Sequence, residues 1–132
     1  MPGILPVRMG TARTLIVDDH TDVRFLIRAI VGDSGLAIEV VGEADGLDSA
    51  LAQLDALDPD VVVLDARMPR ADGFEVAPLL LERRPGLPIV LCSAWVDDAV
   101  RRRAAAAGIR EVLSKDQFDE IPAAIVRLAA TP

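Results

Sequence analysis

The sequence of 132 residues predicts one α/β domain, a five-stranded parallel sheet with helices on both faces. Five short apolar runs rich in β-branched residues are bounded by polar residues, and segments with helical spacing separate them. Strands that are apolar along their whole length are typical of parallel sheets covered on both faces. A third observation, charged residues directly after three of the runs, predicts a site at one edge of this sheet.

The expected strands cover residues 13–18, 37–42, 61–65, 88–93 and 110–114. Because crossovers between parallel strands are right-handed, few topologies remain open. The order 2-1-3-4-5 is expected, with the first and third strands side by side. The crevice at the point where the strand order reverses then lies between Asp18/Asp19 and Asp65.

The first helix is expected to open at His20-Thr21-Asp22, with His20 as a helix-start residue. Its apolar residues are spaced as one helical face: Val23, Leu26, Ile27, Ile30 and Val31. The second helix carries Leu47, Ala50, Leu51 and Leu54 and should stop before Pro59.

The later helices are predicted from capping residues and prolines. Asp72 and Glu75 fit a capping box that opens the third helix, and Pro78 predicts a kink or a helix that is regular only after it. The fourth helix, about 97–107, has a thin apolar face and should be weakly anchored. The fifth is expected from about 118, with Pro122 in its first turn, where proline is tolerated.

Composition narrows the classes of function. The formal net charge of −7 argues against a nucleic-acid-binding surface on this domain. No apolar stretch approaches the roughly 20 residues of a membrane span, and residues 1–12 are expected to form a loose tail rather than a secretory signal. The single cysteine, Cys92, lies in an apolar strand and is expected to be buried. These features favour a cytoplasmic protein.

Four charged residues follow predicted strands: Asp18, Asp19, Asp65 and Lys115. Three carboxylates at one edge would repel one another without a hard divalent cation, and Mg²⁺ prefers oxygen ligands of this kind. Asp65 could attack phosphorus as a nucleophile, with a magnesium ion on Asp19 and Asp65. Lys115 would neutralise a phosphoryl oxygen, and Ser93 could donate a hydrogen bond to another.

The motifs that carry this chemistry are Val17-Asp18-Asp19, Asp65-Ala66-Arg67-Met68-Pro69 with Asp72-Gly73, Cys92-Ser93-Ala94, Gly108 and Leu113-Ser114-Lys115. Their order and positions resemble a response-regulator receiver domain of two-component signalling systems, over residues 13–132. The resemblance implies a flavodoxin-like, doubly wound fold. It also implies a phosphoprotein that takes a phosphoryl group from a histidine kinase in a phosphorelay and catalyses only its own phosphorylation and dephosphorylation.

The resemblance assigns roles to individual residues. Asp65 is the phosphoacceptor, Asp18 and Asp19 form the acid pocket with Asp19 as a direct metal ligand, and the backbone carbonyl of Arg67 completes the Mg²⁺ site. Ser93 is the switch hydroxyl and Lys115 the phosphate-binding lysine. Phosphorylation is expected to act through the helix 4, strand 5, helix 5 face, which is also a homodimer surface by family analogy.

Two positions depart from the family pattern. Val112 stands where the family often has an aromatic residue, and Asp116 stands where it usually has proline after the lysine. The Ser114-Lys115-Asp116 sequence after the last strand is similar to the one in receivers that precede helix-turn-helix output domains. Such an output domain would lie outside this chain. Trp95, two residues after Ser93, is expected to be partly exposed.

Two other classes of function stay open at this stage. One is a pseudo-receiver, a protein-interaction module that works without phosphorylation and need not bind Mg²⁺; the intact aspartates and Lys115 argue against it, and the missing aromatic residue and proline keep it open. The other is a phosphohydrolase with Asp65 as nucleophile. Such an enzyme generally needs an acid/base near the nucleophile, and Arg67 stands where a second aspartate would be useful.

Overall fold

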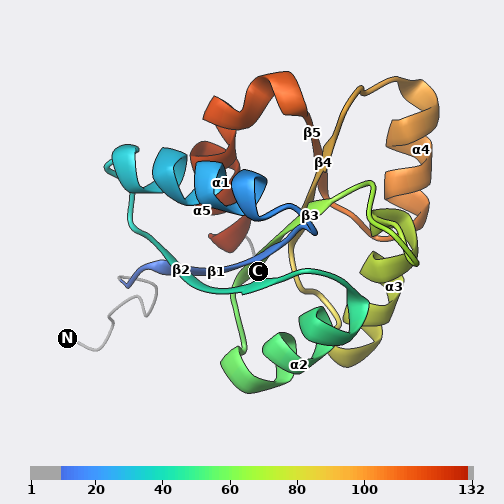
Figure 1. The fold of residues 1–132 in the computed structure, drawn as a ribbon, viewed down its shortest axis with the longest axis horizontal. Coiled ribbons are helices and arrows are strands. Elements are labelled where there is room, and N and C mark those ends of the chain that lie inside the picture. The colour runs from blue at the N-terminus through green and yellow to red at the C-terminus, as the bar shows by residue number, and fades with distance from the viewer. Residues whose placement is uncertain (1–9, 131–132) are drawn as a thin grey trace.

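The computed structural model describes residues 10–130, and it confirms the predicted architecture (Figure 1). Five parallel strands form one sheet in the order β2-β1-β3-β4-β5. The strands are β1 (Ala12–Val17), β2 (Ile38–Ala44), β3 (Val61–Asp65), β4 (Ile89–Ser93) and β5 (Glu111–Ser114). The α-helices are α1 (Thr21–Asp33), α2 (Leu47–Leu57), α3 (Gly73–Arg83), α4 (Asp98–Ala106) and α5 (Ile121–Ala129), and a 3₁₀ helix, η3 (Lys115–Glu120), precedes α5.

Two apolar cores lie on opposite faces of the sheet. One joins alternate strand residues, such as Leu15 and Leu64, to buried residues of α2, α3 and α4. The other joins the intervening strand residues, such as Ile16 and Val63, to α1 and α5. Because successive strand side chains point to opposite faces, each strand must be apolar at nearly every position.

The strand register places the charged residues at one edge. Val17 pairs with Leu64, so Asp18 and Asp65 both follow directly at the carboxyl end. Asp65 pairs with Cys92 on β4, and Ser93 pairs with Ser114, the residue before Lys115. Parallel pairing therefore brings residues that are far apart in the chain to the same rim.

Most predicted elements are confirmed, with three corrections. First, α3 is one helix from Gly73 to Arg83 that contains Pro78, so the helix does not become regular only after the proline. Its start is fixed earlier by the Asp72–Glu75 capping box, in which each side chain accepts a hydrogen bond from the other residue's backbone N–H. Pro78 is exposed, where its ring meets solvent rather than the core.

Second, residue 118 lies in η3, and α5 begins at Ile121. Ser114 caps η3 with its hydroxyl, and this cap holds the chain in a tighter turn after β5. Third, Leu26 is 46% exposed, although its spacing places it on the apolar stripe of α1. Ile27 and Val31 carry the burial of that helix.

Three further predictions are confirmed. The apolar face of α4 is thin, with Ala104 as its buried residue, and the weak anchoring expected from it stays a prediction. Cys92 is buried, and Trp95 is 59% exposed in the loop before α4. The predicted tail of residues 1–12 falls mostly on residues 1–9, which lie outside the described residues, while β1 already starts at Ala12. Between residues 10 and 130, no helix is long and apolar enough to cross a bilayer.

Candidate functional site

The centre of the site is an ion pair between Asp65 and Lys115. Lys115 Nζ lies 2.9 Å from Asp65 Oδ1, and the Asp65 side chain is only 1% exposed. The second oxygen, Oδ2, is buried and has no hydrogen-bond partner among residues 10–130. An unpaired buried carboxylate oxygen costs free energy, so this atom is a candidate position for a ligand or a reaction.

The loop after β1 supplies two more carboxylates. Asp18 is buried, and its Oδ1 accepts a hydrogen bond of 2.8 Å from the backbone N–H of His20. Asp19 is partly exposed, but its Oδ1 is buried and accepts no hydrogen bond from the described residues. Together with His20 and Asp65 these residues offer donor atoms that all lie within 4.8 Å of one another.

Arg24 fixes this loop from α1. Its Nη1 donates to the backbone carbonyl of Asp18 at 2.6 Å, and its Nε donates to Glu43 Oε1 at 2.7 Å. Glu43 also forms an ion pair with Arg28. Burial opposes ionisation of Glu43, but the hydrogen bonds from Arg28 and Arg24 outweigh it and lower its pKa. Arg24 is not one of the apolar residues whose spacing predicts α1, and nothing in the local pattern indicated that its side chain would bind the Asp18 carbonyl.

Gly73 shapes the other side of the site. Its N–H donates to the carbonyl of Ala66 at 3.0 Å. A Cβ at this position would lie 2.5 Å from the carbonyl oxygen of Asp65, 2.7 Å from Leu91 Cδ1 and 3.1 Å from Ala66 Cα. Only glycine lets the start of α3 pack this closely behind the Asp65 backbone.

The other residues that the sequence analysis singled out lie on β4, on the loop after β3 and on β5. Ser93 is buried at the end of β4, one residue beyond the register partner of Asp65. Arg67 is exposed in the loop after β3, and its carbonyl accepts no hydrogen bond from the described residues. Val112 is partly buried against the core under α4. The bond between Lys115 and Asp116 is trans, as is every peptide bond in the described part of the chain.

The electrostatics favour a bound cation. Burial, with the charge of Asp65, raises the pKa of Asp18 despite its hydrogen bonds to His20. Burial disfavours the charged form of Lys115, but contact with Asp65 raises its pKa overall. With the three aspartates ionised, the single lysine leaves an excess of negative charge. The buried oxygens of Asp19 and Asp65 that accept no hydrogen bond from the described residues are hard ligands, so the donor set fits a divalent cation such as Mg²⁺.

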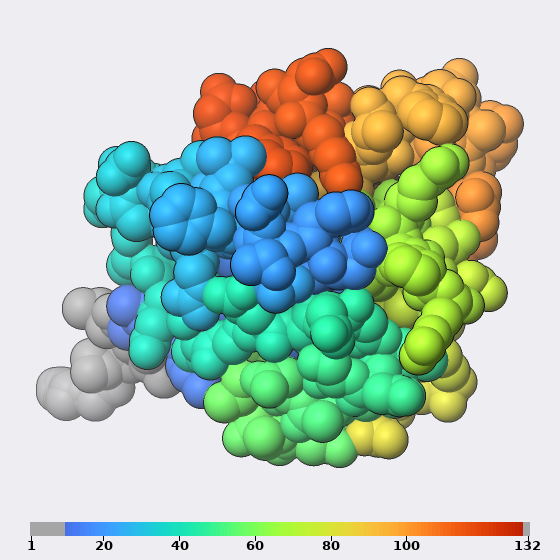
Figure 2. All heavy atoms as spheres, in the orientation of Figure 1, coloured from blue at the N-terminus to red at the C-terminus, as the bar shows by residue number. Residues whose placement is uncertain are grey.

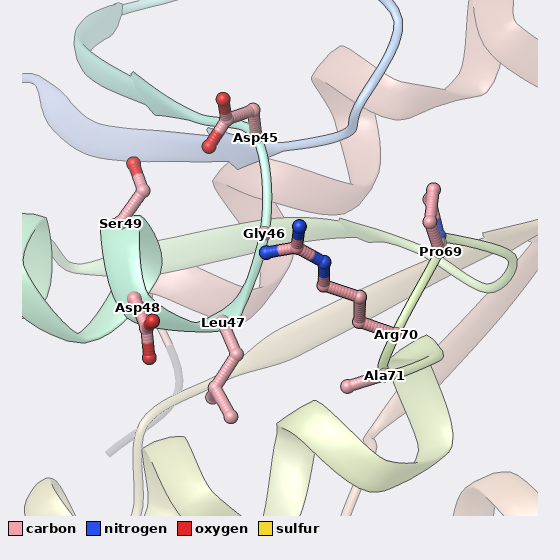
Figure 3. A pocket seen from close by; sticks show the side chains of 8 residues that line it. All are labelled: Asp45, Gly46, Leu47, Asp48, Ser49, Pro69, Arg70 and Ala71. Carbon is pink, nitrogen blue, oxygen red and sulfur yellow. The ribbon is translucent and has the colours of Figure 1, made fainter.

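The surface around the site is built by loops from several elements. Figure 2 shows the start of α1 in blue, the loop after β3 in yellow-green and the segment after β5 in orange-red meeting on one face. A separate groove of about 570 Å³ lies between the loops after β2 and β3. Figure 3 shows Arg70 reaching across it toward Gly46, with Asp45 and Asp48 on the opposite side. This groove shares no lining residue with the acidic cluster.

Comparison with known proteins agrees with this geometry. The family model for the response regulator receiver domain matches residues 14–126. The chemotaxis protein CheY of Listeria monocytogenes is 33% identical over 118 residues, which cover 89% of this chain and 98% of that protein. The receiver domain of NarL from Mycobacterium tuberculosis superposes with a TM-score of 0.83 at 33% identity, covering 93% of this chain and 99% of that one.

The chain belongs to the response regulator receiver domain family of two-component systems. A protein-glutamate methylesterase/protein-glutamine glutaminase of Syntrophus aciditrophicus is 38% identical over 105 residues. The match covers 78% of this chain but only 30% of that relative, so the similarity spans about a third of its length. Members of this family work with histidine kinases and with output domains.

Proposed function

We propose that this chain is a phosphorylation-dependent switch in which Asp65 accepts a phosphoryl group from a histidine kinase. The observation that carries the proposal is the state of the Asp65 carboxylate. It is almost completely buried, one oxygen is paired with Lys115 at 2.9 Å, and the other has no partner among residues 10–130. A nucleophile needs a positioned oxygen with an available lone pair, and Oδ2 meets that requirement.

The transfer forms a bond between an Asp65 oxygen and phosphorus. The bond from phosphorus to the donor atom breaks, and its electron pair leaves with the imidazole of a phosphohistidine or with the acetate of acetyl phosphate. Lys115 then balances the charge of a phosphoryl oxygen, and Ser93 supplies a hydroxyl from the end of β4. Phosphoryl transfer of this kind depends mainly on position and charge neutralisation.

Mg²⁺ would be held by Asp18, Asp19 and Asp65 together with the backbone carbonyl of Arg67. When bound, it would neutralise the carboxylates and the incoming phosphoryl oxygens. The support is the excess of negative charge at the site and the buried oxygens of Asp19 and Asp65 that accept no hydrogen bond from the described residues.

The signal is proposed to leave through the α4, β5 and α5 face toward a downstream effector or output domain. Ser93 is the last residue of β4, and only a short loop separates it from α4. Because Ala104 is the buried residue of α4, a small movement of that loop can shift the helix at low cost. Val112 on β5 takes the position of the family's aromatic residue, so the movement would not need an aromatic side chain.

The test is intact-mass spectrometry after incubation with acetyl phosphate, with and without Mg²⁺. We expect one added phosphoryl group that requires both Mg²⁺ and Asp65. The matched control is Asp65→Asn, which keeps the size of the side chain but removes the anionic nucleophile. A wild-type protein that is folded but gains no adduct, and also fails to bind a beryllofluoride mimic, would instead support the phosphorylation-independent interaction module. Release of more than one equivalent of product from a phosphate ester would support a phosphohydrolase.

A further inference from the structure

His20 occupies a position that the proposed switch does not use. It is the residue before α1, and its side chain makes no capping hydrogen bond to the helix. Instead its ring Nδ1 lies 3.3 Å from Asp18 Oδ1 and 3.2 Å from Asp19 Oδ1. The imidazole therefore faces the carboxylates of the candidate metal site.

The donor atoms of this cluster form a mixed set. One atom each of Asp18, Asp19, His20 and Asp65 lies within 4.8 Å of all the others. An ion held at about 2.0–2.2 Å from its ligands spans donor pairs up to about 4.4 Å apart, so a small adjustment would let all of them reach one ion. The unpaired Oδ2 of Asp65, in a side chain only 1% exposed, independently indicates a ligand at this place.

The chemistry of the ring nitrogen changes which ions this set favours. Mg²⁺ takes oxygen ligands and water, and an imidazole adds little to its binding. First-row transition ions such as Zn²⁺ bind imidazole nitrogen well. The His20 side chain is 62% exposed, so its ring can turn toward an ion without breaking core packing.

We propose that His20 adds a nitrogen ligand to the acidic cluster, so that the site binds Zn²⁺ or a similar transition ion through His20, Asp19 and Asp65 in competition with Mg²⁺. This inference rests on the proposed metal site at Asp65. It makes His20 a residue that determines ion selectivity rather than a simple helix-start residue.

The experiment uses the fact that the chain contains a single histidine. In protein without an affinity tag, the two ring nitrogens of His20 give assignable ¹⁵N signals. We expect Zn²⁺ to shift the Nδ1 signal strongly, whereas saturating Mg²⁺ leaves it nearly unchanged. Calorimetry on His20→Asn at the same pH should show a loss of Zn²⁺ affinity of about 10-fold or more and a change for Mg²⁺ of less than about 2-fold. Asparagine retains a polar side chain, so loss of the nitrogen ligand is the main change.

The outcomes separate the inference from the proposed function. If Zn²⁺ binds without moving the Nδ1 signal, or if His20→Asn weakens both ions equally, the selectivity role of His20 is wrong while the Asp65 site stands. If Asp65→Asn leaves the Zn²⁺-induced shift intact, His20 binds the ion elsewhere and the inference also fails. If the wild type binds neither ion, the proposed metal site itself is wrong.

Discussion

Substitution of Gly73 by alanine tests whether the packing behind Asp65 is as tight as the structure indicates. The added Cβ would lie 2.5 Å from the carbonyl oxygen of Asp65 and 3.1 Å from the Cα of Ala66. Real Cβ atoms hardly ever approach closer than 3.0 Å, so the backbone must move by about 0.5 Å at the first contact. Both neighbours belong to the backbone of the sheet edge and cannot turn away as a side chain could.

The magnitude follows from two opposing effects. Overpacking in a rigid interior costs about 1–3 kcal/mol, and the gain in helix propensity from glycine to alanine returns about 0.5–1 kcal/mol. We expect Gly73→Ala to lower the free energy of unfolding by about 1–2 kcal/mol. With a urea m-value of about 1.5 kcal/mol/M, the unfolding midpoint should fall by about 1 M.

The matched control is Gly32→Ala near the end of α1, where a Cβ would meet no atom within 4 Å. This variant should be neutral or more stable by up to about 1 kcal/mol. The assay is urea unfolding followed by circular dichroism, with phosphorylation yield from acetyl phosphate measured on the same samples. A midpoint for Gly73→Ala at or above that of Gly32→Ala would refute the reasoning about close packing behind Asp65.

Three other predictions follow from the same contacts. Because burial raises the pKa of Asp18, the ionised form of this residue destabilises the fold. Asp18→Asn should therefore raise the free energy of unfolding at pH 7 without divalent ions, and this gain should vanish as the pH falls below the ordinary carboxyl pKa of 3.8. Urea unfolding at both pH values checks this. Burial, with the nearby Asp65 charge, raises the pKa of Cys92 to about 12, so about 1 in 10⁴ of these thiols is ionised at pH 8. Alkylation of Cys92 should therefore proceed only as the protein unfolds. Rapid alkylation of the native protein would contradict the buried position. Arg103 Cζ lies 4.0 Å from the centroid of the Phe74 ring, and its Nη2 lies 3.7 Å from Asp72 Oδ2. Because these contacts are exposed, Arg103→Ala should lower the free energy of unfolding by less than about 1 kcal/mol. The substitution should still increase amide hydrogen exchange in α4, and unchanged exchange there would show that these contacts do not hold the helix.

Much of the fold follows from local patterns in the sequence. The run from Val61 to Asp65 is a strand with the bounds that its apolar residues predict, and the capping box at Asp72 marks the start of α3. These features depend on residues close together in the chain. The exposure of Leu26 could not be read from helical spacing, because it depends on how α1 lies against the sheet and against α5.

The sequence by itself determined the fold class, the strand order expected for it and the residues at the rim: Asp18, Asp19, Asp65 and Lys115. This was possible because parallel strands present their carboxyl ends at one edge, so a charged residue after a buried strand has a predictable place. Only the tertiary structure decided how these residues contact one another. Lys115 forms an ion pair of 2.9 Å with Asp65, and the ring of His20 lies beside two carboxylates. Arg24 donates a hydrogen bond to the Asp18 carbonyl. Such contacts depend on side-chain rotamers and on the close approach of α3 behind β3, which local sequence patterns do not encode.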